Sequence, residues 1–211
     1  MTSIAFKNQF DPERMCNEVA EALQRIYLKK PDPSYLIFPE KRFGVRRVSE
    51  EESKILVTQW LQRASLSYSI ETPTTKTFIQ QGVTAQSALT DVTVYSQGDG
   101  AKRELNIELK AGQAGVESFR KDLEKLLQEQ IPGMWFHTLV TASPNSWKAL
   151  YRKIERALAS LEVRFYDEFD TATHSIYFYF CVLDGASIPP FYVGFGTWRE
   201  DLDRGFASVR P

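Results

Sequence analysis

Two short segments place acidic and basic side chains where strand geometry would bring them together. Segment 103–111 alternates aliphatic and polar residues, which is typical of a β-strand with one face in the core. Glu108 and Lys110 are two residues apart in it, so their side chains share the polar face. In segment 87–95, Asp91 takes the polar face by the same parity, because the valines of that segment take the core face. A glycine-containing turn between the segments predicts a hairpin in which Asp91 and Glu108 converge.

This combination of side chains suits metal-assisted phosphoryl chemistry. Paired carboxylates such as Asp91 and Glu108 supply the hard oxygen ligands that Mg²⁺ prefers, and Mn²⁺ is an alternative ion for the same ligands. A bound divalent ion lowers the pKa of its water and neutralises charge that develops on a phosphodiester. The ammonium group of Lys110 would then act as a point charge on the scissile phosphate or on the attacking water.

The elements that must position these residues follow from hydrophobic periodicity and from turn signals. The pattern predicts a helix from Asp11 to the prolines at 31 and 33, a short extended piece at 35–38 and a helix over 49–64. The strand predicted at 68–71 is expected to stop at Pro73, before the two strands described above. The remaining predictions are a helix at 116–130, a strand at 134–141, a helix at 144–161, strands at 163–165 and 175–183, and an irregular segment or closing hairpin over the last thirty residues.

The central part of the chain resembles the PD-(D/E)xK nuclease superfamily, whose fold is that of restriction endonucleases. The resemblance rests on Thr90-Asp91 in one strand and Glu108-Leu109-Lys110 in the next, with 49–52 opening the preceding helix and 68–73 as the first strand. It covers about residues 49 to 142. The proline that often precedes the aspartate is Thr90 here.

The resemblance implies an α/β fold with a central mixed sheet flanked by helices, and an αβββαβ core. It implies that Asp91 and Glu108 are metal ligands, that Lys110 is the catalytic lysine and that a glutamate of the first core helix is an additional ligand. Glu52 is the candidate for this last position and Glu51 the fallback.

Glu52 has a second interpretation that the sequence leaves open. Ser49-Glu50-Glu51-Glu52 is a capping-box pattern, in which the last glutamate accepts a hydrogen bond from the backbone of the serine. Glu52 also shares a helical face with Leu56, which would direct it towards the packed side. For Glu71 we favour a structural role over a site role.

Two basic clusters are candidates for contact with a phosphate backbone. One lies in the loop before the second helix and comprises Lys41, Arg42, Arg46 and Arg47. The other is a stripe at helical spacing, Lys148, Arg152 and Arg156, in the helix predicted at 144–161. The alternative for both is ordinary solvated surface charge.

Length and composition set the class of protein. The chain has 211 residues, of which 43% are hydrophobic and 13% aromatic, and this predicts about one folded domain. We divide it into an N-terminal helix and basic loop, 1–48, packed on a nuclease-like domain, 49–211, with an aromatic-rich C-terminal extension. Lys and Arg number 26 against 27 Asp and Glu, so a strongly basic nucleic-acid-binding protein is excluded, whereas a local basic patch is not.

The cellular setting is predicted from the absence of two sequence signals. No stretch approaches the roughly 18 apolar residues of a membrane span, and the first residues lack the apolar run of a secretory signal. Cys16 and Cys181 cannot form a disulfide framework or a cysteine zinc site. We therefore expect a cytoplasmic protein with no membrane partner.

The sequence thus predicts a metal-dependent nuclease that hydrolyses phosphodiester bonds in DNA with Mg²⁺. The alternative is a catalytically inactive nuclease-like module that binds nucleic acid or protein. A third hypothesis concerns assembly. The alternating aromatic segment 176–181 is apolar on both faces, which is typical of a strand buried on both sides but would also suit a homodimer surface.

Overall fold

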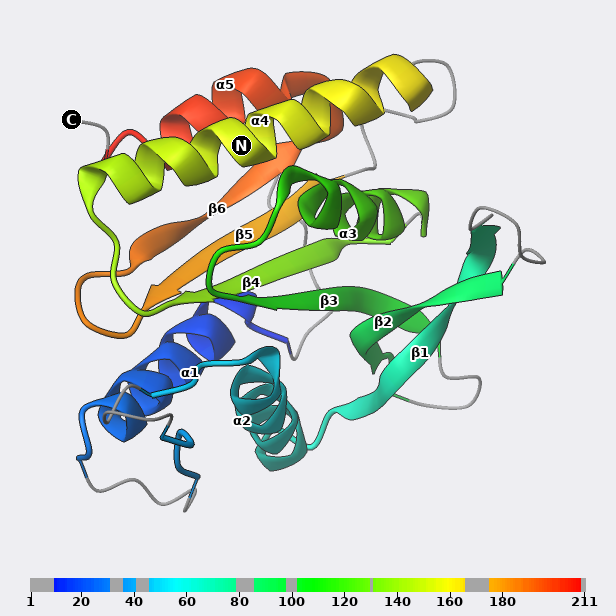
Figure 1. Cartoon of the computed structure of the whole chain (residues 1–211). Coiled ribbons are helices and arrows are strands. Elements are labelled where there is room, and N and C mark those ends of the chain that lie inside the picture. The colour runs from blue at the N-terminus through cyan, green and yellow to red at the C-terminus, as the bar shows by residue number, and fades with distance from the viewer. Residues whose placement is uncertain are drawn as a thin grey trace.

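The computed structural model describes residues 10–30, 36–40, 46–78, 86–97, 102–129, 131–165 and 175–209, apart from the side chains of residues 78, 86, 164 and 165. A six-stranded sheet lies between two layers of helices (Figure 1). Helices α1 (Pro12–Tyr27) and α2 (Glu50–Arg63) cover one face, and α3 (Val116–Gln128), α4 (Pro144–Phe165) and α5 (Trp198–Gly205) cover the other. None of the described helices is both long enough and apolar enough to cross a membrane.

The sheet is mixed, and its strands lie side by side in the order in which they follow along the chain. The strands are β1 (Ser67–Phe78), β2 (Gln86–Tyr95), β3 (Arg103–Ala111), β4 (Gly133–Leu139), β5 (Ser175–Val182) and β6 (Ile188–Gly194). The pairs β1–β2, β2–β3 and β5–β6 are antiparallel, whereas β3–β4 and β4–β5 are parallel. The prediction of an α/β fold with a mixed sheet flanked by helices is confirmed.

Two local predictions are wrong and a third is incomplete. Strand β1 continues through Pro73 to residue 78, because β1 is the edge of the sheet and an edge strand needs backbone N–H groups towards one side only. The segment 163–165 is the last turn of α4 and not a strand. The last thirty residues form β6, the short 3₁₀ turn Phe195–Thr197 and helix α5, so the closing hairpin is present but a helix follows it.

Both faces of β3 are buried, and this corrects the expectation of a half-buried strand. Its aliphatic residues join α1 and α2 in one hydrophobic core, as the alternation predicts. The polar face lies beneath α3, whose apolar residues belong to the second core, on the other side of the sheet. Glu108 is consequently buried, and it needs partners within the protein.

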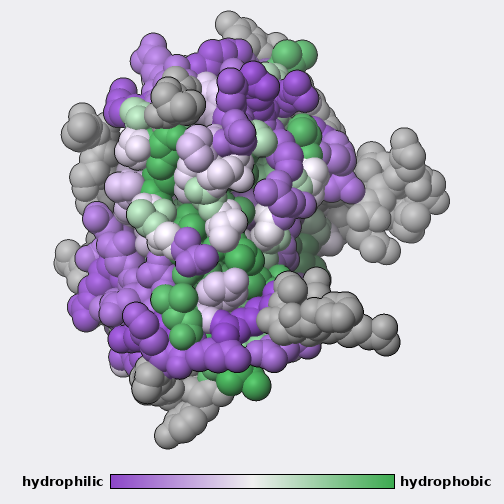
Figure 2. All heavy atoms as spheres, turned by 60° about the vertical axis from the view of Figure 1, so that its left-hand side comes forward, coloured by the Kyte–Doolittle hydropathy of each residue, from purple (hydrophilic) through white to green (hydrophobic). Residues whose placement is uncertain are grey.

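The aromatic segment 176–181 lies in β5, which is buried on both faces between β4 and β6. The interpretation as a doubly buried strand is confirmed. Figure 2 shows the side of the molecule on which the β5–β6 connection lies, with hydrophobic residues gathered in the middle of the surface and hydrophilic residues around them. The homodimer remains a prediction.

A close contact between α5 and β6 gives a test of the packing at this end of the fold. A Cβ atom at Gly205 would overlap the ring of Phe191, which packs against the helix. Gly205 is the last residue of α5, and in a helix interior alanine is favoured over glycine by about 1 kcal/mol. We expect Gly205→Ala to have the opposite sign here and to lower the free energy of unfolding by about 1–3 kcal/mol, measured by urea denaturation.

The control for this test is the combination with Phe191→Ala. If the overlap causes the loss, Gly205→Ala will cost less in a Phe191→Ala background than in the wild-type protein. Equal costs in the two backgrounds would contradict the packing described here.

Candidate functional site

The site forms where the pairing of β2 with β3 ends. The two strands pair from Tyr95 opposite Arg103 as far as Val92 opposite Ile107. Beyond that point the Asp91 side chain contacts β3 in place of the β2 backbone. Its Oδ2 accepts a hydrogen bond of 2.8 Å from the backbone N–H of Leu109. Asp91 is therefore fixed beside the residue that follows Glu108, and the convergence predicted from strand parity is consistent with this position.

Glu108 lies beneath α3, and its side chain is 1% exposed. Its Oε2 accepts a hydrogen bond of 2.7 Å from the Lys125 ammonium, which also donates to the carbonyl of Leu89 in β2 at 3.0 Å. Its second oxygen, Oε1, is buried and has no hydrogen-bond partner among the described residues. A buried carboxylate oxygen without a partner is costly, so this atom marks a place where a further cation or donor would be stabilising.

The electrostatic environment of Glu108 favours its neutral form. Burial raises the pKa of Glu108 to about 8, against the lowering effect of Lys125, and the negative charges of Asp122 and Asp91 raise it further. Asp91 is thus close enough to Glu108 for its charge to raise the pKa of Glu108.

Lys110 connects the two helical layers at the end of β3. Its ammonium lies 2.8 Å from Asp122 Oδ2 in α3 and 3.3 Å from Glu50 Oε1 in α2. Burial lowers the pKa of Lys110, but Asp122 and Glu50 raise it by more, and the result lies above the ordinary value. Lys110 therefore stays protonated at neutral pH and can act as a cation but not as a base.

These contacts form one continuous series of ion pairs. It runs from Glu108 to Lys125, from Lys125 to Asp122 at 3.1 Å, and from Asp122 through Lys110 to Glu50. We call it the β3 ion-pair series. It links both helical layers through β3, so the polar residues of the site and the packing of α2 and α3 depend on each other.

A second group of charges surrounds Lys54 of α2. Its ammonium lies 2.5 Å from Glu71 Oε1, 3.3 Å from Asp91 Oδ1 and 3.8 Å from Glu51 Oε1. Burial lowers the pKa of Lys54, but Glu71 and Asp91 raise it to well above its ordinary value. Asp91 is thus held on one oxygen by the β3 backbone and on the other by Lys54.

The three glutamates at the start of α2 have different contacts. Glu52 Oε2 accepts hydrogen bonds from the backbone N–H of Ser49 at 2.9 Å and from its hydroxyl at 2.6 Å, which is the capping-box arrangement. Glu51 reaches Lys54, and Glu50 reaches Lys110. The glutamate that meets the predicted catalytic lysine is therefore Glu50, and the contacts of Glu52 are those of a helix cap.

Sequence reasoning missed four members of the site: Glu50, Lys54, Asp122 and Lys125. The spacing of Asp122 and Lys125 indicates a pair within one helix, and that pair is present. No sequence signal shows that both also reach across to β3, because that contact depends on how α3 packs on the sheet.

His137 lies on β4 beside Lys110 and supports the turn that follows β3. Its Nε2 is 2.8 Å from the carbonyl oxygen of Gly112, which has a positive φ of 68° that suits glycine. Burial lowers the pKa of His137 to about 4, so the ring is neutral at neutral pH. His137 is thus a buried residue of β4.

The predicted phosphate-binding residues lie on two separate surfaces. Lys41 and Arg42 fall outside the described residues. Arg46 stacks over the ring of Tyr27 at 5.0 Å, and Arg47 is exposed three residues before α2. On α4, Lys148 and Arg152 are exposed and line a cavity of about 270 Å³ together with Trp147, Tyr151, Glu155, Phe206 and Val209.

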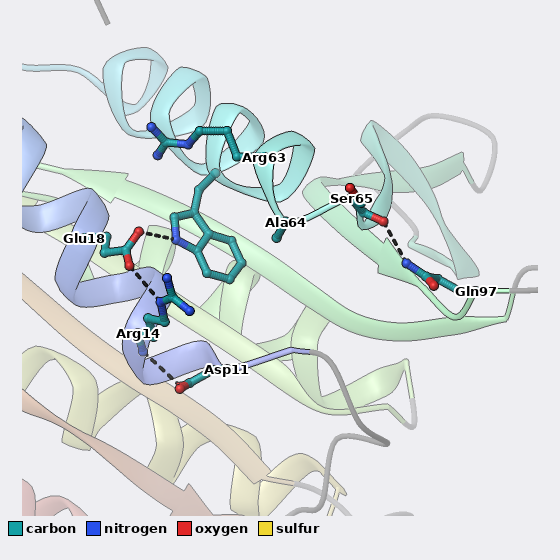
Figure 3. A pocket seen from close by; sticks show the side chains of 8 residues that line it. Asp11, Arg14, Glu18, Arg63, Ala64, Ser65 and Gln97 are labelled. Carbon is teal, nitrogen blue, oxygen red and sulfur yellow. Dashed lines mark hydrogen bonds and ion pairs between the residues drawn. The ribbon is translucent and has the colours of Figure 1, made fainter. Parts of the chain in front are cut away.

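A cavity of about 750 Å³ lies between the start of α1, the end of α2 and β2 (Figure 3). Arg14 and Glu18, two of the charged residues that line it, are paired with each other. Arg14 binds Glu18 at 2.8 Å, and Glu18 accepts a hydrogen bond from the indole of Trp60 at 2.9 Å. None of the predicted site residues lines this cavity, so it is separate from the candidate site.

Carboxylates outnumber ammonium groups in the combined site. Six acidic side chains contact three lysines: Glu50, Glu51, Glu71, Asp91, Glu108 and Asp122 against Lys54, Lys110 and Lys125. Within the described ranges, no group of three or more His, Cys, Asp or Glu side chains is arranged to hold a metal ion. The donor chemistry and the unpartnered oxygen of Glu108 nevertheless fit a hard divalent cation.

Comparisons with protein-family models, with curated proteins and with solved structures find no match to this chain. The function has to be argued from the site.

The two environments of Glu52 and Glu51 lead to a stability test. Glu52→Ala removes the acceptor of the Ser49 backbone N–H and should lower the free energy of unfolding by about 1 kcal/mol, measured by urea denaturation. Glu51→Ala is the matched control, because Glu51 is exposed and makes no contact with Ser49. An equal loss in both variants would show that the capping contact contributes nothing.

The raised pKa of Glu108 predicts a pH dependence of stability. A group whose pKa is higher in the folded than in the unfolded state loses its stabilising contribution as the pH rises through the folded value. Between pH 5 and pH 9 in EDTA, wild-type protein should therefore lose stability relative to Glu108→Gln, whose side chain cannot ionise. Urea denaturation at several pH values measures the difference.

The control is Glu117→Gln, because Glu117 is exposed and Arg120 lowers its pKa. Its difference from wild type should stay constant over the same range. A constant difference for Glu108→Gln as well would mean that Glu108 is ionised throughout.

Proposed function

We propose that this protein is a metal-dependent nuclease that hydrolyses phosphodiester bonds in DNA, on a restriction-endonuclease-like core formed by α2, β1, β2, β3, α3 and β4. The observation that carries the proposal is the meeting of Asp91, Glu108, Lys110 and Glu50 at the end of the β2–β3 pairing. The order of these elements, helix, strand, strand, strand, helix, strand, supports the same assignment.

Asp91 and Glu108 would hold Mg²⁺, or Mn²⁺ in its place, and Glu50 is paired with Lys110 at the end of the same strand. When bound, the ion would supply an activated water and a positive charge for the phosphodiester. The buried oxygen of Glu108 without a hydrogen-bond partner supports this role. Because Glu108 has a raised pKa, its use as a ligand would release a proton, and ion binding should strengthen as the pH rises.

Lys110 would stabilise the charge that develops on the phosphate. Hydrolysis forms a bond from a water oxygen to phosphorus and breaks the bond to the leaving oxygen, which takes up a proton. Negative charge grows on the phosphoryl oxygens during this exchange, and a fixed ammonium group nearby lowers its energy. Asp122 and Glu50 hold Lys110 in place and keep it protonated.

The loop before α2 is the surface best placed to bind the nucleic-acid backbone. Arg47 is exposed and lies three residues before Glu50, so a phosphate on Arg47 would be near the site. Lys148 and Arg152 lie on α4, with pocket partners from the segment after α5, and would serve as a second, separate contact.

A cleavage assay with Lys110→Ala tests the proposal. Supercoiled plasmid, linear duplex, single-stranded DNA and RNA are each incubated with Mg²⁺, Mn²⁺ or EDTA. We expect metal-dependent cleavage by the wild-type protein and a loss of about 10²-fold or more in the variant, the usual effect of removing one group that stabilises transition-state charge.

Lys121→Ala is the matched control, because it removes the same charge from an exposed position on α3. It should retain activity. Cleavage that survives both EDTA and Lys110→Ala would overturn the proposal. If no nucleic acid is cut while DNA is still bound, the inactive binding module becomes the better description.

A further inference from the structure

Lys54 occupies the position where a cation would meet Asp91. Its side chain is 14% exposed, and its ammonium has carboxylate oxygens of Glu71, Asp91 and Glu51 within 3.8 Å. Lys54 comes from α2, on the opposite face of the sheet from Lys125, so the two lysines approach the carboxylates from different sides. Asp91 Oδ2 accepts a hydrogen bond from the β3 backbone. Its other oxygen, Oδ1, is paired with Lys54.

The backbone at Glu71 is adapted to this contact. Glu71 has a φ of 50°, in the left-handed region that residues with a side chain rarely adopt. Its neighbours remain in register with β2, with Ile70 opposite Val92 and Thr72 opposite Thr90. The left-handed conformation thus lies between two residues that keep the same register, and Glu71 makes the shortest contact to Lys54. Backbone strain of this kind is commonly found at functional sites.

An ammonium group and a divalent cation cannot share Asp91 Oδ1 at full strength, because both need the same oxygen and their charges repel each other. Lys54 has an alternative position, since Glu71 and Glu51 already contact it and both are more exposed than Asp91. Movement of Lys54 towards these two residues would free Asp91 and leave the ammonium paired.

We propose that Lys54 is a built-in competitor for the divalent ion at Asp91, and that ion binding requires transfer of Lys54 to Glu71 and Glu51. This inference rests on the metal site of the proposed function. It adds a residue that controls ion affinity and does not itself hold the ion. Lys54 keeps Asp91 paired without the ion, and its displacement costs part of the binding free energy.

The test is the affinity of the full chain for Mg²⁺ and for Mn²⁺, measured by isothermal titration calorimetry and by the shift in melting temperature. Lys54→Met keeps an unbranched side chain only one atom shorter and removes the competing charge. We expect its apparent Kd to be about tenfold lower than that of the wild-type protein, within the usual range for coupling between two binding events. Lys121→Met removes the same charge from the exposed surface of α3 and should change the Kd by less than about twofold.

Glu71→Gln provides a second variant with the opposite sign. Without the Glu71 charge, Lys54 loses its best alternative partner and stays on Asp91, so ion affinity should fall. This result keeps the inference testable if Lys54→Met does not fold.

The outcomes separate the inference from the proposed function. Ion binding by the wild-type protein with an unchanged or weaker affinity in Lys54→Met would overturn the role of Lys54 and leave the nuclease proposal intact. If neither the wild-type protein nor Lys54→Met binds Mg²⁺ or Mn²⁺, the metal site itself fails, and the inference fails with it. Tighter binding in Lys54→Met, with Lys121→Met unchanged, supports the competition.

Discussion

Glu108 is a carboxyl group buried inside the sheet under a helix, and much of the site follows from what that burial requires. A buried carboxyl group needs a hydrogen-bond donor in either protonation state, and burial also raises its pKa. Lys125 of α3 is that donor, and it brings α3 and β3 into contact. Asp122, one turn earlier, is then placed between Lys125 and Lys110. The β3 ion-pair series therefore starts at one buried carboxyl group and extends from residue to residue until it reaches Glu50 on the opposite side of the sheet.

The position of the site within the fold could be predicted from the sequence, because strand parity is a local rule. Alternation over 103–111 correctly assigns the aliphatic residues to one core and Glu108 and Lys110 to the other face. The cover over that face could not be predicted in the same way. Polar residues on one face of a strand indicate that this face is exposed to water. Here α3 covers it, with buried apolar residues and with two charged residues that pair with β3. That contact is between elements distant in the sequence, so the local pattern of apolar and polar residues does not predict it.

The glutamates of α2 show the same limit at the level of single residues. Three consecutive helical positions point in directions about 100° apart, so one of them can cap the helix, one can meet Lys54 and one can meet Lys110. The capping-box pattern offers the cap as one of two interpretations of Glu52, because both partners are local, and the structure shows the capping contact. The contact of Glu50 depends on the angle at which α2 crosses the sheet, and no spacing rule gives that angle. Similarly, β1 passes through Pro73 because it is an edge strand, and its place at the edge is known only when the sheet is assembled.

The three lysines allow the carboxylates of the site to lie close together without a metal ion. They differ in how deeply their partners are buried. Lys125 is paired with a carboxyl group that is almost fully buried, and its removal would leave Glu108 without its hydrogen-bond donor. Lys54 shares its ammonium among partners of which two are well exposed, so water can take over part of their solvation when the lysine moves. A site of this kind would gain an ion by exchange and not by filling an empty space. The free energy of ion binding then depends on how readily one positive charge gives way to another, and Asp91, which touches both Lys54 and the β3 backbone, is the residue at which that exchange would take place.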